Sequence, residues 1–134
     1  MARGTVNRLG ELERAVMEVL WEREGPATAR DVGRALVDRD LAYTTVMTVL
    51  DRLTRKGFVD RERAGRAWSY TPAASREAYI TGLMLDALDD TGDRDAALVR
   101  FARSVSSPEA EVLRGALAEA DDRRKDADGD PGRG

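Results

Sequence analysis

Apolar residues recur every three or four positions in three successive stretches near the start of the chain. These stretches cover residues 9–23, 28–38 and 43–56. Such spacing gathers apolar side chains on one face of an α-helix, so it predicts three amphipathic helices. Gly57 stands just after the third stretch, where a glycine commonly ends a helix.

Short polar patterns indicate where the first two helices begin. Thr28 and Asp31 have the spacing of a capping box, in which a side chain and a backbone N–H at each position pair reciprocally. Gly10 and Glu13 form a weaker pair of the same spacing at the start of the first helix. A glycine and a proline at 25–26 end that first helix.

After the third helix the pattern changes to a period of two. Residues 58–63 and 67–71 each predict a β-strand, and Gly65 lies in the short turn between them. Trp68 and Tyr70 fall on one side of the second strand, where we expect them to close a core instead of stacking on bases. Three helices followed by a hairpin indicate a winged helix-turn-helix whose third helix is the recognition helix.

The remaining sequence predicts three further helices, over residues 75–88, 93–105 and 107–120. Beyond them the chain is charged and lacks large apolar residues, which is typical of a disordered tail. The predicted fold class is mainly α with a small β-hairpin, a winged helix-turn-helix followed by a C-terminal helical region. We expect a winged-helix DNA-binding domain at 1–73, a helical dimerisation domain at 74–120 and a disordered acidic tail at 121–134.

The three C-terminal helices carry more apolar surface than they can hide among themselves. Self-association would cover this surface, and a two-fold symmetric dimer suits a protein that recognises two DNA half-sites. The alternative is a monomer whose C-terminal helices fold over the first domain. The residues expected at the dimer interface are Tyr79, Leu83, Met84, Leu88, Leu98, Phe101, Leu113 and Leu117.

The amino-acid composition limits which catalytic and metal sites the chain can form. The chain contains no cysteine and no histidine, which excludes disulfides, thiolate zinc sites, thiol nucleophiles and imidazole bases. We expect no cofactor, although a metal site made of carboxylates alone stays open. Residues 1–73 hold 13 basic and 11 acidic residues, whereas residues 74–134 hold 9 basic and 14 acidic residues. Segment 52–66 has six basic residues against two acidic ones, so nucleic acid would bind the N-terminal part.

The exposed side of the predicted recognition helix suits contact with DNA. Threonine hydroxyls hydrogen-bond to base edges or phosphates, and threonine and methionine methyl groups contact thymine. Arginines of the helix and the wing suit phosphates or the minor groove. The candidate DNA-binding residues are Tyr43, Thr44, Thr45, Met47, Thr48, Arg52, Arg55, Arg61, Arg63 and Arg66. Each feature alone also fits a solvated helix face or a strand with cross-strand ion pairs to Glu62, but together they favour DNA.

Two other functions are compatible with parts of the sequence. A winged-helix module can bind a protein instead of DNA, although the basic segment favours DNA. An enzyme would need a catalytic constellation, and the sequence contains no glycine-rich phosphate loop or nucleophile motif. Asp89, Asp90, Asp93 and Asp95 fit solvated helix caps better than a hard-cation site. We therefore expect no metal site and no enzymatic activity.

The sequence contains no signal for a membrane. No apolar run approaches the roughly 20 residues that a spanning helix needs. The first ten residues are polar and lack the apolar region of a signal peptide. We therefore expect a cytoplasmic protein without a membrane partner.

Four sequence segments occur together in a familiar order. They are LGELE at 9–13, VMEVLW at 16–21, TVMTVLDRLTRKG at 45–57 and WSYTP at 68–72. This combination resembles the penicillinase-repressor family (the BlaI/MecI type). The resemblance covers about residues 7–120 in architecture, and its specific motifs end near Pro72.

The resemblance implies a homodimeric transcriptional repressor of palindromic double-stranded operator DNA, which it binds through the 43–56 helix and the 58–71 wing. It further implies control of β-lactam-response or related genes, with relief through a sensor-linked protease. Family members cut in that way carry an Asn-Phe bond in the fifth helix, and the matching candidate cleavage position here is Arg100-Phe101. A copper-responsive branch senses metal through C-terminal cysteines, which this chain lacks. The inducing signal therefore stays open.

Overall fold

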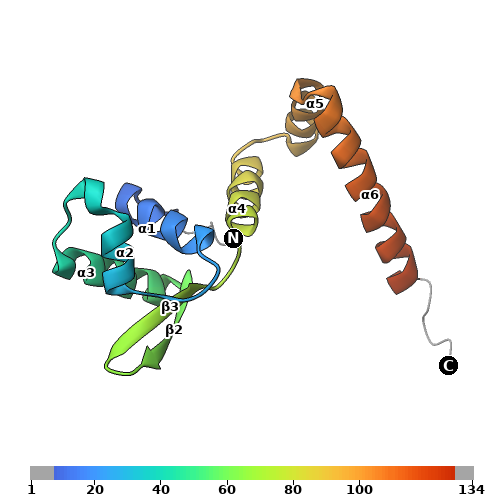
Figure 1. The fold of residues 1–134 in the computed structure, drawn as a ribbon. Helices are drawn as coiled ribbons and strands as arrows, with labels where there is room; N and C mark the ends of the chain where they lie inside the picture. The colour runs from blue at the N-terminus through green and yellow to red at the C-terminus, as the bar shows by residue number, and fades with distance from the viewer. Residues whose placement is uncertain (1–7, 129–134) are drawn as a thin grey trace. The chain divides into compact units, whose positions relative to one another are not determined.

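The computed structural model describes residues 8–128 and divides into a first unit that ends at Asp90 and a second that begins at Thr91. The elements of the first unit are α1 (Glu11–Glu22), β1 (Ala27–Thr28), α2 (Ala29–Ala35), η1 (Val37–Arg39), α3 (Tyr43–Lys56), β2 (Val59–Ala64), β3 (Ala67–Pro72) and α4 (Arg76–Asp89) (Figure 1). The second unit consists of α5 (Arg94–Ser104) and α6 (Ser107–Asp128). The division falls after α4 and not at residue 73, where the sequence placed a boundary.

The sheet has three antiparallel strands in the order β1-β3-β2. Ala27 pairs with Tyr70 in β3, so a short third strand that the sequence did not predict ties the start of α2 to the hairpin. The hairpin closes through a turn at Gly65 and Arg66, and Gly65 has a φ of 69°, which glycine adopts without strain. Three helices and this sheet confirm the predicted winged helix-turn-helix (Figure 1).

The core of the first unit forms where the apolar faces of α1, α2 and α3 meet the inner face of the sheet. The helical spacing predicted this arrangement, because the buried positions on each helix fall on one side. Tyr70 is a core residue as expected, and Trp68 packs against the core while staying partly exposed. The buried cluster consists of Val16, Met17, Leu20, Ala27, Ala29, Val32, Val46, Val49, Leu50, Leu53, Val59 and Tyr70.

Local signals fix the ends of the helices. Asp31 N–H donates to Thr28 Oγ1 at 3.2 Å and Thr28 N–H donates back to Asp31 Oδ2 at 3.0 Å, so the predicted capping box is formed. Gly57 ends α3 in the left-handed conformation with a φ of 86°. The second helix ends at Ala35 and not at residue 38, because the chain tightens into a 3₁₀ turn at η1.

A buried carboxylate fastens the end of α3 to the start of α1. Glu13 Oε1 accepts hydrogen bonds from Gly10 N–H at 2.7 Å and from Lys56 Nζ at 2.9 Å. Burial acts to raise the pKa of Glu13. Hydrogen bonds from Gly10 and Lys56 and the charges of Lys56 and Arg52 outweigh burial, so the pKa lies below its ordinary value. The ion pair thereby ties the last turn of α3 to the start of α1.

We expect Glu13→Ala to lower the free energy of unfolding by about 2 kcal/mol, because it leaves Lys56 and the Gly10 N–H without their acceptor. The folded-state pKa of Glu13 is depressed, so this stabilisation is present near neutral pH and is lost as the pH falls into the acidic range. Urea titrations over a pH series should therefore show the two proteins converging in acid. The control Glu11→Ala removes an exposed pair with Arg39 and should change stability much less. A difference that persists unchanged in acid would contradict the role of the ion pair.

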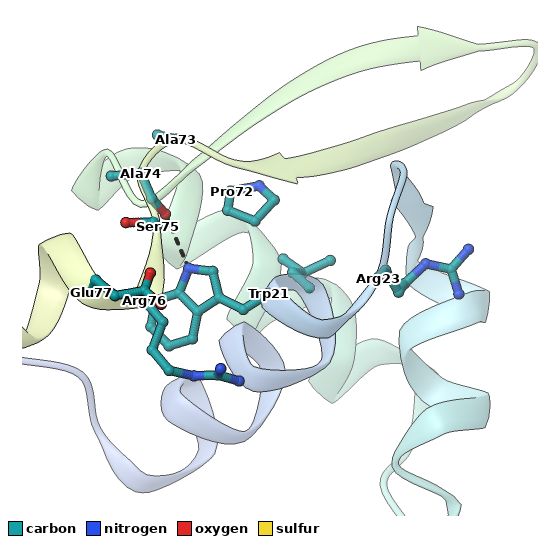
Figure 2. Close-up of a pocket in the computed structure, with 9 residues that line it drawn as sticks. Trp21, Arg23, Pro72, Ala73, Ala74, Ser75, Arg76 and Glu77 are labelled. Atoms are coloured by element: carbon teal, nitrogen blue, oxygen red, sulfur yellow. Dashed lines mark hydrogen bonds between the residues drawn. The ribbon is translucent and has the colours of Figure 1, made fainter.

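The first turn of α4 is anchored on α1 by aromatic and polar contacts. Tyr79 Oη accepts the Leu9 N–H at 3.0 Å, and its ring lies 5.9 Å from the ring of Trp21. Trp21 Nε1 donates to the Ala74 carbonyl at 3.0 Å beside an open cavity of about 430 Å³ (Figure 2). Tyr79 is only 8% exposed. Tyr79 was expected from the sequence at the dimer interface, but its side chain is occupied by these contacts within the first unit.

Arginine side chains add ion pairs to this junction between α1 and α4. Arg76 Nε donates to Glu18 Oε1 at 3.0 Å, and Arg14 Nε donates to Glu18 Oε2 at 2.8 Å. Hydrogen bonds from Arg76 and then Arg14 lower the pKa of Glu18. Both guanidinium groups also lie against the Trp21 ring. The chain that leaves the wing is thus fixed to α1 before it continues into α4.

The second unit is purely helical. Asp93 Oδ1 caps α5 by accepting the Ala96 N–H at 3.0 Å. The last helix continues to Asp128, so residues 121–128 are helical and not part of a disordered tail; the rest of that predicted tail, 129–134, lies outside the described residues. Exposed ion pairs one turn apart, such as Arg124 with Asp121 at 2.9 Å, favour this extension. No residue of α5 or α6 is buried.

Within residues 8–128, no helix combines the length and the apolar character that crossing a membrane requires.

Candidate nucleic-acid interface

The helix α3 presents a continuous polar stripe opposite its buried side. Thr44, Thr48 and Arg52 are exposed and succeed one another at one-turn spacing, and Arg55 extends the stripe toward the end of the helix. Short hydroxyl side chains therefore occupy the first half of the stripe, where a helix can approach base edges closely. Of the other candidates on α3, Tyr43 is exposed, whereas Thr45 and Met47 are half-buried at the margins.

Basic and acidic side chains of the wing lie on opposite faces of β2. Arg61 pairs across the hairpin with Tyr70, and Arg63 pairs with Trp68, so both arginines lie on the face that closes the core. The acidic side chains at 60 and 62 alternate onto the opposite face. The cross-strand ion pairs to Glu62, which the sequence offered as the alternative to DNA contact, are not formed among the described residues. The two arginines are instead directed to the same side as the helices, and Arg66 lies in the turn.

The two wing arginines rest on one aromatic ring. The guanidinium carbon of Arg61 lies 4.3 Å from the centroid of the Trp68 ring, and that of Arg63 lies 4.8 Å from it. Asp51 Oδ1 also lies 3.8 Å from Arg61 Nη1, while Asp51 Oδ2 lies 2.8 Å from Arg55 Nη2. These contacts hold the wing arginines beside α3. We call the exposed stripe of α3 and Arg61, Arg63 and Arg66 the recognition face.

A hollow of about 330 Å³ lies between the start of α2, the first turns of α3 and the wing. Sequence reasoning missed one of its residues, Arg30, which is exposed and makes no ion pair with any residue of the described range. Arg30 is placed beside the wing because β1 pairs with β3, and that pairing has no sequence signal of its own. The residues that line the hollow are Thr28, Ala29, Arg30, Tyr43, Met47, Arg66, Ala67, Trp68 and Tyr70.

The cations of this region differ in how they are engaged. Arg55 and Arg61 share Asp51, whereas Arg52 and Arg66 make no hydrogen bond or ion pair within the part of the chain that the structure describes. Unpaired guanidinium groups can bind phosphate oxygens without first losing a carboxylate partner. Arg52, Arg66 and Arg30 are the exposed arginines of this region without a carboxylate at ion-pair distance among the described residues.

The described residues show no arrangement for metal chemistry. No group of three or more histidine, cysteine, aspartate or glutamate side chains between residues 8 and 128 is placed to hold a metal ion. In the acidic run after α4, Asp93 acts as a helix cap. The recognition face is a surface of hydroxyl and guanidinium groups, which suit the binding of DNA.

The residues expected at a dimer interface fall into two groups. In the first unit, Met84 is exposed on α4 and Leu83 and Leu88 are half-buried. In the second unit, Leu98 and Leu117 are 47% and 61% exposed. Phe101 and Arg100, the candidate cleavage pair, are exposed within α5, and Leu113 is half-buried on α6.

A helix-turn-helix closed by a three-stranded antiparallel wing, with arginines and threonines on one face, defines the winged-helix class of DNA-binding proteins. Comparison with known proteins narrows the class. The family model for the penicillinase repressor matches residues 9–119. The Transcriptional regulator BlaI of Mycobacterium tuberculosis (strain ATCC 25618 / H37Rv) is 53% identical over 118 residues, which cover 85% of this chain and 86% of that protein.

More distant matches are similar in part. The Penicillinase repressor of Bacillus licheniformis is 27% identical over 75 residues, or 56% of this chain and 59% of that protein. The crystal structure of a probable transcriptional regulator from Pseudomonas aeruginosa matches 85% of this chain and 80% of that chain at 26% identity, with a TM-score of 0.48. The family model and the mycobacterial relative show that the chain belongs to the penicillinase-repressor family, as its motifs predicted. It is a transcriptional repressor of the winged-helix class.

Proposed function

We propose that the protein acts as a homodimer that binds palindromic operator DNA and represses β-lactam-response or related genes. The observation that carries the dimer is the absence of any buried residue in α5 and α6, beside a first unit with a closed core. Two helices without a fully buried residue need another surface to be stable. A second copy supplies the same apolar faces by symmetry.

The DNA end of the proposal rests on the recognition face. Two copies related by a two-fold axis present two recognition helices to two half-sites in successive turns of the major groove. Thr44 and Thr48 contact base edges, and Arg52 and Arg66 bind phosphates. A protein bound across a promoter in this way blocks transcription of the genes behind it.

Relief of repression would act through the dimer. The candidate bond between Arg100 and Phe101 lies inside α5 and is exposed. A protease requires extended backbone, so α5 must unwind there, and a helix without buried residues unwinds at low cost once the copies separate. Cutting at this position would divide the second unit and leave two weakly binding first units. A sensor-linked protease is the partner that this step requires.

Two substitutions separate phosphate contact from base recognition. Arg66→Ala should weaken binding to every sequence and reduce the salt dependence of binding by about one counterion for each bound copy. Thr48→Ala should leave that salt dependence unchanged and reduce discrimination at the contacted base pair by about fivefold. Fluorescence anisotropy at several salt concentrations, on operator and shuffled duplexes, measures both quantities.

Genome-wide mapping of the binding sites of the native protein identifies the operator sequence. Discrete sites with inverted repeats, bound by the purified protein in a salt-sensitive way, support the proposal. Absence of discrete sites would contradict the specific DNA function and direct the search to a protein partner for the recognition face.

Arg123→Ala is the control for Arg66→Ala, because it removes one arginine charge from the second unit. It should leave the salt dependence of DNA binding unchanged. Thr48→Ala with the wild-type preference would show that this residue is misplaced.

A further inference from the structure

One acidic side chain lies among the cations of the recognition face. Asp51 is on α3 and half of its side chain is exposed. A carboxylate on a surface that meets phosphates repels them and lowers affinity for DNA of any sequence. Asp51 therefore weakens the DNA binding that the neighbouring arginines provide. Its contacts indicate a compensating role.

Asp51 joins the recognition helix to the wing. One carboxylate oxygen pairs with Arg55 one turn further along α3, and the other lies 3.8 Å from Arg61 on β2. Arg61 rests on the Trp68 ring, with Arg63 on the same ring. The guanidinium of Arg61 is thus held by a carboxylate from the helix and an aromatic ring from the wing. Two long side chains that would otherwise sample many rotamers are restrained before DNA arrives.

We propose that Asp51 is a positioning residue that gives the recognition face its sequence specificity, in addition to the DNA binding proposed above. On duplex of arbitrary sequence, the carboxylate of Asp51 competes with the phosphates for Arg55 and Arg61, which lie 2.8 and 3.8 Å from it. On the operator, the helix lies in register in the major groove and the wing arginines meet the duplex in the arrangement that Asp51 fixes. Asp51 therefore lowers nonspecific affinity more than operator affinity.

The variant Asp51→Asn tests this role. It should raise affinity for a shuffled duplex about fivefold and steepen the salt dependence on that duplex by about one counterion per copy, since the freed arginines reach additional phosphates. Affinity for a duplex selected from a random-sequence library with the wild-type protein should stay the same or fall. The ratio of the two affinities should therefore fall at least fivefold.

Asp60→Asn is the matched control, because it removes the same charge from the opposite face of the adjoining strand β2. Asp60→Asn should raise the affinities for the shuffled and the selected duplex by the same factor, and that factor should be smaller than the one expected for Asp51→Asn on the shuffled duplex. Arg61→Ala completes a double-mutant cycle: on that background Asp51→Asn should reduce the affinity ratio much less, since part of its effect acts through Arg61. Thermal melting of each variant shows whether the fold is retained.

The outcomes distinguish this inference from the proposed function. If the wild-type protein selects no sequence and binds no DNA in a salt-sensitive way, the DNA function fails and the role of Asp51 fails with it. If the wild-type protein selects a sequence but Asp51→Asn raises both affinities by the same factor, Asp51 is only a surface charge and the inference alone is overturned. A full effect of Asp51→Asn in the Arg61→Ala background would equally overturn the coupling to the wing.

Discussion

The double variant Leu98→Glu and Leu117→Glu is expected to be monomeric at concentrations where we propose that the wild-type protein is dimeric. Both side chains are exposed apolar residues of the second unit. A buried glutamate without a partner in a dimer interface costs several kcal/mol, and two-fold symmetry places each change in the interface twice. Analytical ultracentrifugation measures the expected change from dimer to monomer directly.

Operator affinity should fall at least about 100-fold in this variant, because the second half-site then binds without the effective concentration that a dimer provides. The first unit should remain folded, since its core lies entirely before residue 90. Near-ultraviolet circular dichroism of Trp21 and Trp68 checks this. Val37→Glu, an exposed apolar-to-charged change in η1 of the first unit, controls for the charge and should leave the dimer intact. A variant that still dimerises would place the interface elsewhere.

The elements that the sequence predicts correctly are those specified by local pattern. The three- and four-residue spacing of α3 identifies its buried side, and the change to a period of two identifies the hairpin. Thr28 and Asp31 form the cap that their spacing indicates. The period of two also places Arg61 and Arg63 on one face of the wing. Neighbours along the chain determine each of these features.

The features that were missed depend on residues distant in sequence. A two-residue strand such as β1 exists only because Ala27 meets Tyr70, and no local pattern marks it. The position of Arg30 follows from that pairing. The contact of Asp51 with Arg61 likewise needs the wing to fold back beside α3. The end of α6 was placed too early because charged residues without large apolar neighbours resemble a tail, although their ion pairs at one-turn spacing favour a helix.

Leu50→Ala is expected to cause the largest loss of stability in the first unit, about 3 kcal/mol. Leu50 is fully buried on the inner side of α3, within the core between the helices and the sheet. Truncation removes the transfer free energy of the lost methyl groups and leaves a cavity that rigid neighbours fill only in part. Thermal denaturation should show a transition lower by more than about 10 °C.

The matched control is Thr48→Ala on the same helix, two residues away but on the exposed side. Its unfolding free energy should stay within about 0.5 kcal/mol of the wild-type value, because no buried contact is lost. The two variants together separate the inner face of α3, which holds the fold, from the outer face, which we propose to contact DNA. Leu50→Ala should weaken operator binding only as far as it unfolds the protein, and cooling should restore that binding. Thr48→Ala should alter sequence preference at every temperature where the protein is folded. If Leu50→Ala instead changed preference while fully folded, the division of α3 into a structural and a recognition face would be wrong.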